Sequence, residues 1–385
     1  MEVNIISIKR KENGKYQITV EAGRDPVTGK RRRRYTTCET KKEAKIKEAE
    51  LIKQVKKGII KSSGNITVAE HLKEWLKEDC QDLAPRTYSS YKMIVKKHIV
   101  PVLGHIKLEK LNPKHIQIYQ NHKLKEGRID GKGGLSNRTV QYHHRVLSRA
   151  LKIAVRWHII EENPCKYVDA PSVKKKKASS IDIKDIKKII NAAKDTWLYE
   201  ILMVGLFTGM RRGEILGLKW DNIDFDKRLL KVRWQVQHIR NKGIFIRELK
   251  TDSSYREIDI PDNIVFMLKK MVTKQNKKKL QAGKLYDDHD LVFCYDNGKP
   301  RNPQGVTKKF NKIVRKTNID RKYRFHDLRH TFSTLQLQEG TEMKTLQELL
   351  GHAVYSTTAD TYSHVTKNMK KRAANNINKA LKNTK

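Results

Sequence analysis

Cysteines, long apolar runs and acidic residues are all scarce in this chain of 385 residues. The four cysteines are isolated and form no Cys-x-x-Cys pair, which argues against a zinc site or a disulfide framework and predicts reduced thiols. The longest apolar run, ILMVGLF, is far too short to cross a bilayer, and the start of the chain lacks the apolar core and cleavage site of a signal peptide. We therefore expect a cytoplasmic protein without a membrane partner.

Basic residues are abundant instead. The chain has 83 Lys and Arg against 42 Asp and Glu, a net charge of +41, and its 37% of hydrophobic residues is enough to build cores. Such a surplus says little about the fold, but it points to a polyanionic partner: DNA, RNA or an anionic membrane surface. The alternative is a soluble basic protein whose lysines are merely solvated.

Residues 1–60 predict a small domain of three strands and one helix. Strands are expected in NIISIKR, NGKYQITVEAG and RRRRYTTCE, with turns between them. A helix is expected in TKKEAKIKEAELIKQVKK, where Thr40 and Glu43 form a capping box.

The basic charge is concentrated in this first region. Residues 1–63 hold 18 Lys and Arg against 8 Asp and Glu, and one predicted strand carries Arg31, Arg32, Arg33 and Arg34. A basic β-ribbon is one of the shapes that enter the major groove of DNA. We therefore favour a nucleic-acid contact for these arginines over a solvated edge strand.

Residues 65–168 predict an all-helical domain with short connections. Helix starts are marked by capping residues or first-turn prolines: Thr67 with Glu70, Pro85, Asn112 with Pro113, and Ser136. The helix after Ser136 is predicted from residues that recur near the 3.6-residue period: Val140, Leu147, Leu151, Ala154 and His158.

Residues 178–385 follow a polar, lysine-rich linker and predict a mixed, mainly helical domain. Helices are expected in DIKKIINAAK and YEILMVGLF, and a third is expected to run through EILGLKWDNIDF. Strands are expected in RLLKVRWQVQHI, GIFIREL and YREIDIP. The fold class is therefore α+β: a small three-stranded sheet plus helix, an all-helical domain, and a mixed domain with a small antiparallel sheet.

The stretch TGMRRGEILGLKW holds the first candidate site residues. Thr208 and Gly209 interrupt an apolar helix, and Arg211 follows at the start of the next helix. A helix N-terminus with an arginine is a natural anion site. Glu214 shares a face with Arg211 and could orient it. A plain surface ion pair is the alternative.

Two further stretches carry cations and imidazoles. ELKTDSSYREIDIP places Lys250 at a hairpin tip, where a lysine is usually only solvated. RFHDLRHTFST places His326 and Arg329 on one helix face. His326 and His330 also have a metal-ligand spacing, but the usual glutamate and a third ligand are missing, which argues against a metal.

The stretch GHAVYSTTADTYSHV contains His352 and two tyrosines, Tyr355 and Tyr362. Tyrosine is a weak nucleophile with a pKa near 10. Two arginines, a lysine and histidines around one phosphate would stabilise its developing charge without metal or ATP. The local sequence does not by itself choose between the two tyrosines, although the weakly anchored STTAD segment favours Tyr362.

In this order, FTGMRRGEI, FHDLRHTFST and LLGH followed by STT and TYSHV resemble the signature boxes of the tyrosine recombinase (phage integrase) family. The helical region is similar to that family's core-binding domain, and residues 1–60 look like the arm-binding domain of integrases from temperate phages and integrative conjugative elements. The resemblance implies that Arg211 and Arg329 clamp a phosphate, and that Tyr362 is the nucleophile.

The resemblance also implies the other roles. His326 would be a hydrogen-bonding or general-base partner, Lys250 would protonate the leaving 5′ oxygen, His352 would donate to a non-bridging oxygen, and Glu214 would support Arg211. It implies a 3′-phosphotyrosyl intermediate, a Holliday junction, no cofactor, and a homotetramer on two DNA duplexes, nucleoid-associated when bound. An excisionase or DNA-bending protein is an expected accessory partner.

Three alternatives stay open at this point. A cellular recombinase that resolves chromosome or plasmid dimers would resemble the same catalytic region but usually lacks the arm domain. A type IB topoisomerase would share the tyrosine chemistry without exchanging partners. A non-catalytic DNA-binding protein could use the same fold, but six intact candidate positions argue against it.

Overall fold

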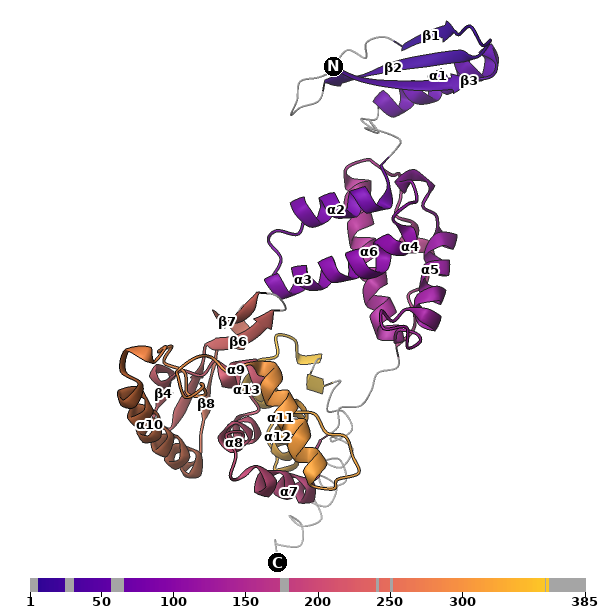
Figure 1. Cartoon of the computed structure of the whole chain (residues 1–385). Helices are drawn as coiled ribbons and strands as arrows, with labels where there is room; N and C mark the ends of the chain where they lie inside the picture. Colours follow the sequence, from indigo (N-terminus) through magenta and orange to yellow (C-terminus); the bar gives the residue numbers. More distant parts are fainter. Residues whose placement is uncertain are drawn as a thin grey trace, which may run out of the picture. The chain divides into compact units, whose positions relative to one another are not determined.

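The computed structural model (Figure 1) describes residues 6–24, 31–56, 66–173, 180–239, 242–249, 252–356 and 358–359. The chain divides into two compact units, Met1–Lys174 and Lys175–Lys385. No helix in the described ranges is long and apolar enough to cross a membrane.

The first unit begins with the predicted small sheet and helix. The antiparallel sheet has the order β1-β2-β3, and the element bounds are β1 Ile6–Arg10, β2 Tyr16–Arg24, β3 Arg31–Cys38 and α1 Lys41–Lys56. Helix α1 packs on the sheet through Ala44 against Ile18, both fully buried. Thr40 and Glu43 form their predicted reciprocal hydrogen bonds at its start. The predicted turn at 25–30 and the side chains of Arg31 to Arg34 lie outside the described part.

The rest of the first unit is helical, as predicted. Its elements are α2 Val68–Glu78, α3 Pro85–Ile94, the π-helical turn η1 Val95–Ile99, α4 Val100–Leu103, η2 Leu108–Lys110, α5 Pro113–Glu126, α6 Asn137–Arg156 and η3 Pro164–Tyr167. The predicted starts are confirmed: Thr67 and Glu70 form a capping box, Pro85 and Pro113 occupy first-turn positions, and Ser136 accepts from the backbone of Thr139.

The long helix α6 supplies one wall of this core. Val140, Leu147, Leu151 and Ala154 are fully buried, as their period predicts. The inclusion of His158 in that helix is wrong. Helix α6 ends at Arg156, and His158 is an exposed residue with a positive φ of 56°, which a continuing helix does not allow.

The second unit combines helices with two small antiparallel sheets. The strands β4 Ile223–Asp224, β5 Leu229–Val232 and β8 Arg256–Asp259 form one sheet, and β6 Trp234–Ile239 pairs with β7 Gly243–Glu248. The helices are α7 Ile183–Ala193, α8 Tyr199–Thr208, α9 Arg212–Leu216, η4 Trp220–Asn222, η5 Asp252–Ser254, α10 Asp262–Ala282, η6 Gly283–Leu285, α11 Pro303–Lys316, α12 Asp327–Gln338 and α13 Met343–Leu350.

Two boundaries in this unit differ from the prediction. The predicted single strand 228–239 is split at Arg233, because β5 pairs with β8 whereas β6 pairs with β7. The predicted helix through 214–225 stops at Leu216. There Gly217 lies so close to β6 that a Cβ atom would meet the Gln235 Cα at 2.6 Å, so the chain turns away and enters β4.

Helices α8 and α12 pack together at the centre of the second unit (Figure 1), where α8 is hydrophobic almost all round. Ile201, Leu202 and Val204 of α8 are fully buried in a core that also includes Leu328 of α12.

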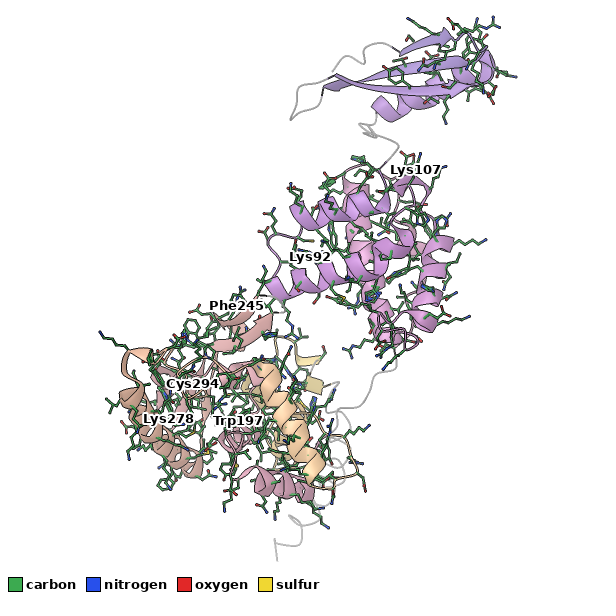
Figure 2. The ribbon with its side chains drawn as sticks, in the orientation of Figure 1. Lys92, Lys107, Trp197, Phe245, Lys278 and Cys294 are labelled. Atoms are coloured by element: carbon green, nitrogen blue, oxygen red, sulfur yellow. The ribbon has the colours of Figure 1, made fainter. Side chains whose placement is uncertain are left out.

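The β6–β7 hairpin carries Phe245, labelled in Figure 2, with the Arg247 guanidinium 5.5 Å from its ring. The packed helices provide a rigid base for the residues that follow them in sequence.

Candidate active site

Arg211 is positioned by the end of helix α8. Gly209 caps α8 in the left-handed conformation with φ of 61°, and a Cβ atom there would collide with the ring of Phe332. The chain then reverses, and Arg211 becomes the N-cap of α9. The TGMR sequence is thus a glycine-dependent turn that presents an arginine at a helix start, as predicted.

Glu214 is the buried acidic centre of the site, with 3% of its side chain exposed. Its Oε1 accepts from Arg211 Nη1 at 2.7 Å, and its Oε2 accepts from the Arg211 backbone N–H at 2.9 Å and from Arg256 Nη2 at 2.7 Å. Burial alone would raise the pKa of Glu214, but Arg256 and Arg211 hold that pKa below its ordinary value. The carboxylate therefore stays ionised and holds both guanidinium groups.

The C-terminal end of helix α13 binds three arginines through three successive carbonyl oxygens. Leu349 O accepts from Arg256 Nε at 2.7 Å, Leu350 O accepts from Arg329 Nη2 at 2.6 Å, and Gly351 O accepts from Arg211 Nη2 at 3.2 Å. The last carbonyls of a helix have no intrahelical partner and lie at the negative end of its dipole. They are therefore suited to cations.

Arg329 is almost completely buried and links this helix end to two other groups. Its Nη1 donates to Gly209 O at 2.8 Å, and its Nη2 lies 2.9 Å from His352 Nε2. A guanidinium only donates, so Nε2 of His352 must accept. The proton of the neutral ring is then on Nδ1, which lies 2.9 Å from the hydroxyl of the buried Thr358.

The electrostatics of the site keep both histidines neutral. Burial, together with Arg329 and Arg211, lowers the pKa of His352 to about 4. Desolvation by neighbouring atoms, with His330 and Arg329 nearby, likewise lowers the pKa of His326 to about 4, although the residue keeps contact with solvent. His326 is the N-cap of α12, and its ring meets that of His330 edge-on at 4.9 Å. Neutral imidazoles in an arginine-rich cluster can each accept a proton or a hydrogen bond.

Two predicted site residues, Lys250 and Tyr362, lie outside the described residues. The chain on either side of Lys250 is described: Leu249 N donates to Arg233 O at 2.9 Å, and the Tyr255 hydroxyl donates to Leu249 O at 3.1 Å. Tyr355, the other tyrosine of the stretch GHAVYSTTADTYSHV, is half exposed.

The structure adds two residues that the sequence patterns did not single out. Arg256 shares Glu214 with Arg211, and Thr358 holds the ring of His352. The available signal for Arg256 was its place in the strand YREIDIP, six residues after Lys250. The signal for Thr358 was its position in the polar STTAD segment that precedes Tyr362. Neither pattern distinguishes a buried side chain from a solvated one.

As a chemical unit, the described part of the site is a ring of guanidinium groups and neutral imidazoles around the end of one helix. Among the three described arginines of this site, Arg211 has 38% of its side chain exposed, while Arg329 and Arg256 are buried. Such an arrangement can bind a phosphate and stabilise charge that develops on it.

The comparisons with known proteins agree with this chemistry. Family models match along the chain: an arm DNA-binding domain over residues 7–55, the N-terminal SAM-like domain of phage integrases over 67–124, and the phage integrase family over 179–369. A XerC-like tyrosine recombinase of Caldanaerobacter subterraneus subsp. tengcongensis is 30% identical, over 95% of this chain and 97% of that protein. The ICEBs1 integrase of Bacillus subtilis strain 168 is 28% identical, over 98% and 100%.

This chain therefore belongs to the phage integrase family of tyrosine recombinases. It is an enzyme, a DNA strand transferase that uses a tyrosine nucleophile. Solved structures share the fold. The Tn1549 transposon integrase in complex with a circular intermediate DNA has a TM-score of 0.66 at 19% identity, over 80% of this chain and 100% of that chain. A lambda integrase tetramer bound to a Holliday junction has a TM-score of 0.53 at 18% identity, over 90% and 95%.

Proposed function

We propose that this protein is an integrase that inserts and excises a mobile genetic element by cutting and rejoining DNA at specific sites. The observation that carries the proposal is the convergence of three arginines on the end of α13, directly before the segment that holds His352 and Tyr362. The similarity of this chain to the ICEBs1 integrase covers 98% of the chain, and residues 7–55 match an arm DNA-binding domain. Both findings support an integrase over a dimer-resolving recombinase.

Five side chains act directly in the proposed chemistry. Arg211 and Arg329 bind the non-bridging oxygens of the scissile phosphate, and the Tyr362 hydroxyl oxygen attacks the phosphorus. His326 takes the phenol proton, and Lys250 gives a proton to the departing 5′ oxygen. The P–O bond to the 5′ oxygen breaks as the bond to tyrosine forms, which leaves a 3′-phosphotyrosyl link and a free 5′ hydroxyl. A 5′ hydroxyl of the partner duplex then loses its proton and attacks the phosphorus, the bond to the Tyr362 oxygen breaks, and the tyrosine regains its proton, so no nucleotide cofactor is consumed.

The placement of His352 adds one requirement to this scheme. Its Nε2 accepts from Arg329, so it cannot donate to a phosphate oxygen while that contact persists. Donation to DNA requires the Arg329 contact to open, with the proton moved to Nε2. A bound phosphate would replace this contact, because its oxygens accept hydrogen bonds from both the Arg329 guanidinium and the His352 imidazole.

We assign three parts of the chain to three tasks. Residues 1–60 would bind arm-type sites, with Arg31 to Arg34 among the contacts; residues 65–168 would bind core-type sites; and residues 178–385 would carry the chemistry. The family matches at 7–55, 67–124 and 179–369 support these limits. Phosphate contacts from the surplus of 83 basic residues would make binding strongly salt-dependent.

The proposed assembly is a homotetramer on two duplexes. The lambda integrase tetramer bound to a Holliday junction, which shares this fold, supports it. Strand exchange through such a junction needs two active protomers at a time. Expected accessory partners are an excisionase or a DNA-bending protein, and the proposed location is the cytoplasm, on the nucleoid when bound to DNA.

The experiment that tests this function uses a nicked suicide substrate, in which the released fragment diffuses away and traps the covalent adduct. We expect an adduct with the wild-type protein, none with Tyr362→Phe, and the wild-type amount with the matched control Tyr355→Phe. The substrate is an attachment site taken from the ends of the element that encodes the protein. An adduct formed by Tyr362→Phe would overturn the nucleophile assignment.

A second assay separates the integrase from its alternatives. We expect the wild-type protein to join two plasmids through their attachment sites, and a truncation lacking residues 1–60 to lose this joining while it still cleaves an isolated core site. Relaxation of supercoiled DNA without joining would favour a topoisomerase. Joining that does not depend on residues 1–60 would favour a dimer-resolving recombinase.

A further inference from the structure

Arg256, the first residue of strand β8, makes hydrogen bonds in three directions although only 6% of its side chain is exposed. Its Nε donates to Leu349 O at 2.7 Å, its Nη1 donates to Ser254 O at 3.1 Å, and its Nη2 donates to Glu214 Oε2 at 2.7 Å. A guanidinium is planar and carries its donors in a fixed fork, so its partners must keep fixed relative positions.

The three acceptors belong to three different parts of the site. Ser254 lies in the short helix η5, directly after the stretch that contains Lys250. Leu349 lies at the end of α13, three residues before His352. Glu214 holds Arg211 through its other carboxylate oxygen. Gly351 also lies against this junction, since a Cβ atom there would meet Ser253 O at 3.1 Å and Arg256 Nη1 at 3.2 Å.

The charge balance explains why this position needs a cation. Glu214 is buried and ionised, and each of its two oxygens accepts from one guanidinium. Removal of one partner would leave a buried carboxylate half compensated, which is costly. A lysine would restore the charge but not the fork, because a single ammonium on a flexible chain cannot hold three acceptors in one plane.

We propose that Arg256 is a positioning residue that aligns helix η5, which follows Lys250 in the chain, with the Arg211–Glu214 pair and the end of α13. The inference rests on the proposed function, in which Lys250 protonates the leaving oxygen and Arg211 binds the phosphate. Arg256 is buried and its donors point inward, so it acts through these neighbours and not by contact with DNA. Its loss misplaces the general acid relative to the clamped phosphate.

The test compares cleavage of two suicide substrates by Arg256→Lys. One has an ordinary phosphodiester, and the other has sulfur at the 5′ bridging position, whose departure needs no proton. A misplacement near 1 Å costs about 100-fold in rate, so we expect the ordinary substrate to be cleaved about 100-fold more slowly. The sulfur substrate recovers at least about 10-fold of that loss, because general-acid catalysis contributes about 100-fold or more.

The matched control is Arg228→Lys, which changes an exposed arginine paired with Asp262 at 3.0 Å. We expect this variant to cleave both substrates at the wild-type rate. Thermal unfolding and DNA binding are measured for both variants, and a second comparison places Arg256→Lys in a Lys250→Ala background. In that background we expect Arg256→Lys to lower the cleavage rate by less than about 3-fold further, because the effects of residues that act together are not additive.

The outcomes separate the proposal from the proposed function. No adduct from the wild-type protein on either substrate would refute the function itself. A normal wild-type adduct, with Arg256→Lys equal to Arg228→Lys, would refute only the role of Arg256. Equal losses on both substrates, or a full additional loss in the Lys250→Ala background, would show a general structural effect and overturn the positioning role.

Discussion

Arg329 and His352 hold each other: Nη2 of the guanidinium lies 2.9 Å from Nε2 of the imidazole. The other ring nitrogen, Nδ1, lies 2.9 Å from the Thr358 hydroxyl. The histidine is therefore fixed from both sides, and its tautomer is set by the arginine. This pair connects the proposed phosphate-binding arginines to the segment that leads to Tyr362, four residues beyond Thr358.

The first prediction concerns Thr358, which is fully buried. Thr358→Val keeps the shape of the side chain but removes the hydroxyl, so Nδ1 of His352 loses its partner. An unpaired buried donor costs about 1–3 kcal/mol, and we expect the free energy of unfolding to fall by that amount. The unfolding transition in denaturant measures it.

The same substitution also tests the link to catalysis. Since the ring of His352 is no longer held on its Nδ1 side, we expect adduct formation to fall about 10-fold, by analogy with the loss of an outer hydrogen-bond partner at other sites. Ser356→Ala, which changes an exposed residue of the same segment, is expected to leave both measurements unchanged. Unchanged activity in Thr358→Val would mean that His352 does not need this contact.

The second prediction concerns Gly209, whose carbonyl accepts from Arg329. A residue other than glycine pays about 1–2 kcal/mol for the left-handed conformation, and the added Cβ also meets the Phe332 ring. Overpacking typically costs about 1–3 kcal/mol more. We expect the free energy of unfolding of Gly209→Ala, measured by denaturant titration, to fall by the sum of these two costs. We also expect this variant to cleave DNA poorly.

The control for this experiment is Gly131→Ala. Gly131 has a similar φ of 68°, but nothing lies within 4 Å of its added Cβ. We therefore expect Gly131→Ala to lower the free energy of unfolding only by the conformational cost. Equal destabilisation by the two substitutions would contradict the role assigned to the contact with Phe332.

The third prediction concerns pH and the buried His143 of helix α6. Burial, then His98 and Lys123, lower the pKa of His143 to about 4. The Tyr119 hydroxyl lies 2.9 Å from its Nδ1, and the His98 ring centre lies 4.6 Å away. A second cation is therefore unfavourable beside the buried Lys123.

The sign of the pH dependence follows from these positions. The native pKa lies below the unfolded value near 6.5, so between about pH 6.5 and 4 the unfolded chain binds more protons than the native protein. The stability contribution is fully present above pH 6.5 and is lost as the pH falls, by about 2–3 kcal/mol over that window. We expect the melting temperature of the full chain to fall accordingly.

His143→Gln removes the titrating group while it keeps a polar side chain near Tyr119. We expect a shallower dependence of the melting temperature on pH in this variant, whereas the exposed control His105→Gln keeps the wild-type slope. The same slope in His143→Gln and the wild-type protein would assign the effect to other groups, such as His71 or His98, whose pKa values burial also lowers.

Local features were predictable because their causes are local. The capping boxes at Thr40 and Thr67 and the helix starts at Pro85 and Ser136 depend on side chains within three residues of the bond they make. Two of the errors occurred where a distant segment intervened. Helix α9 stops because β6 lies against Gly217, and residues 228–239 divide into two strands because each half has a different partner strand.

By itself, the sequence determined that this protein is a basic, multi-part chain with the recombinase boxes in order, because charge, hydrophobic period and motif spacing are written in the residues. Only the tertiary structure decided how Arg211, Arg256 and Arg329 are held. Besides Glu214 and His352, their acceptors are backbone carbonyls, which every residue possesses, and these contacts span 140 residues for Arg211 and 93 for Arg256. Because every residue has the same backbone carbonyl, the residue type does not show which carbonyl will accept from an arginine. That choice is made only when the chain folds.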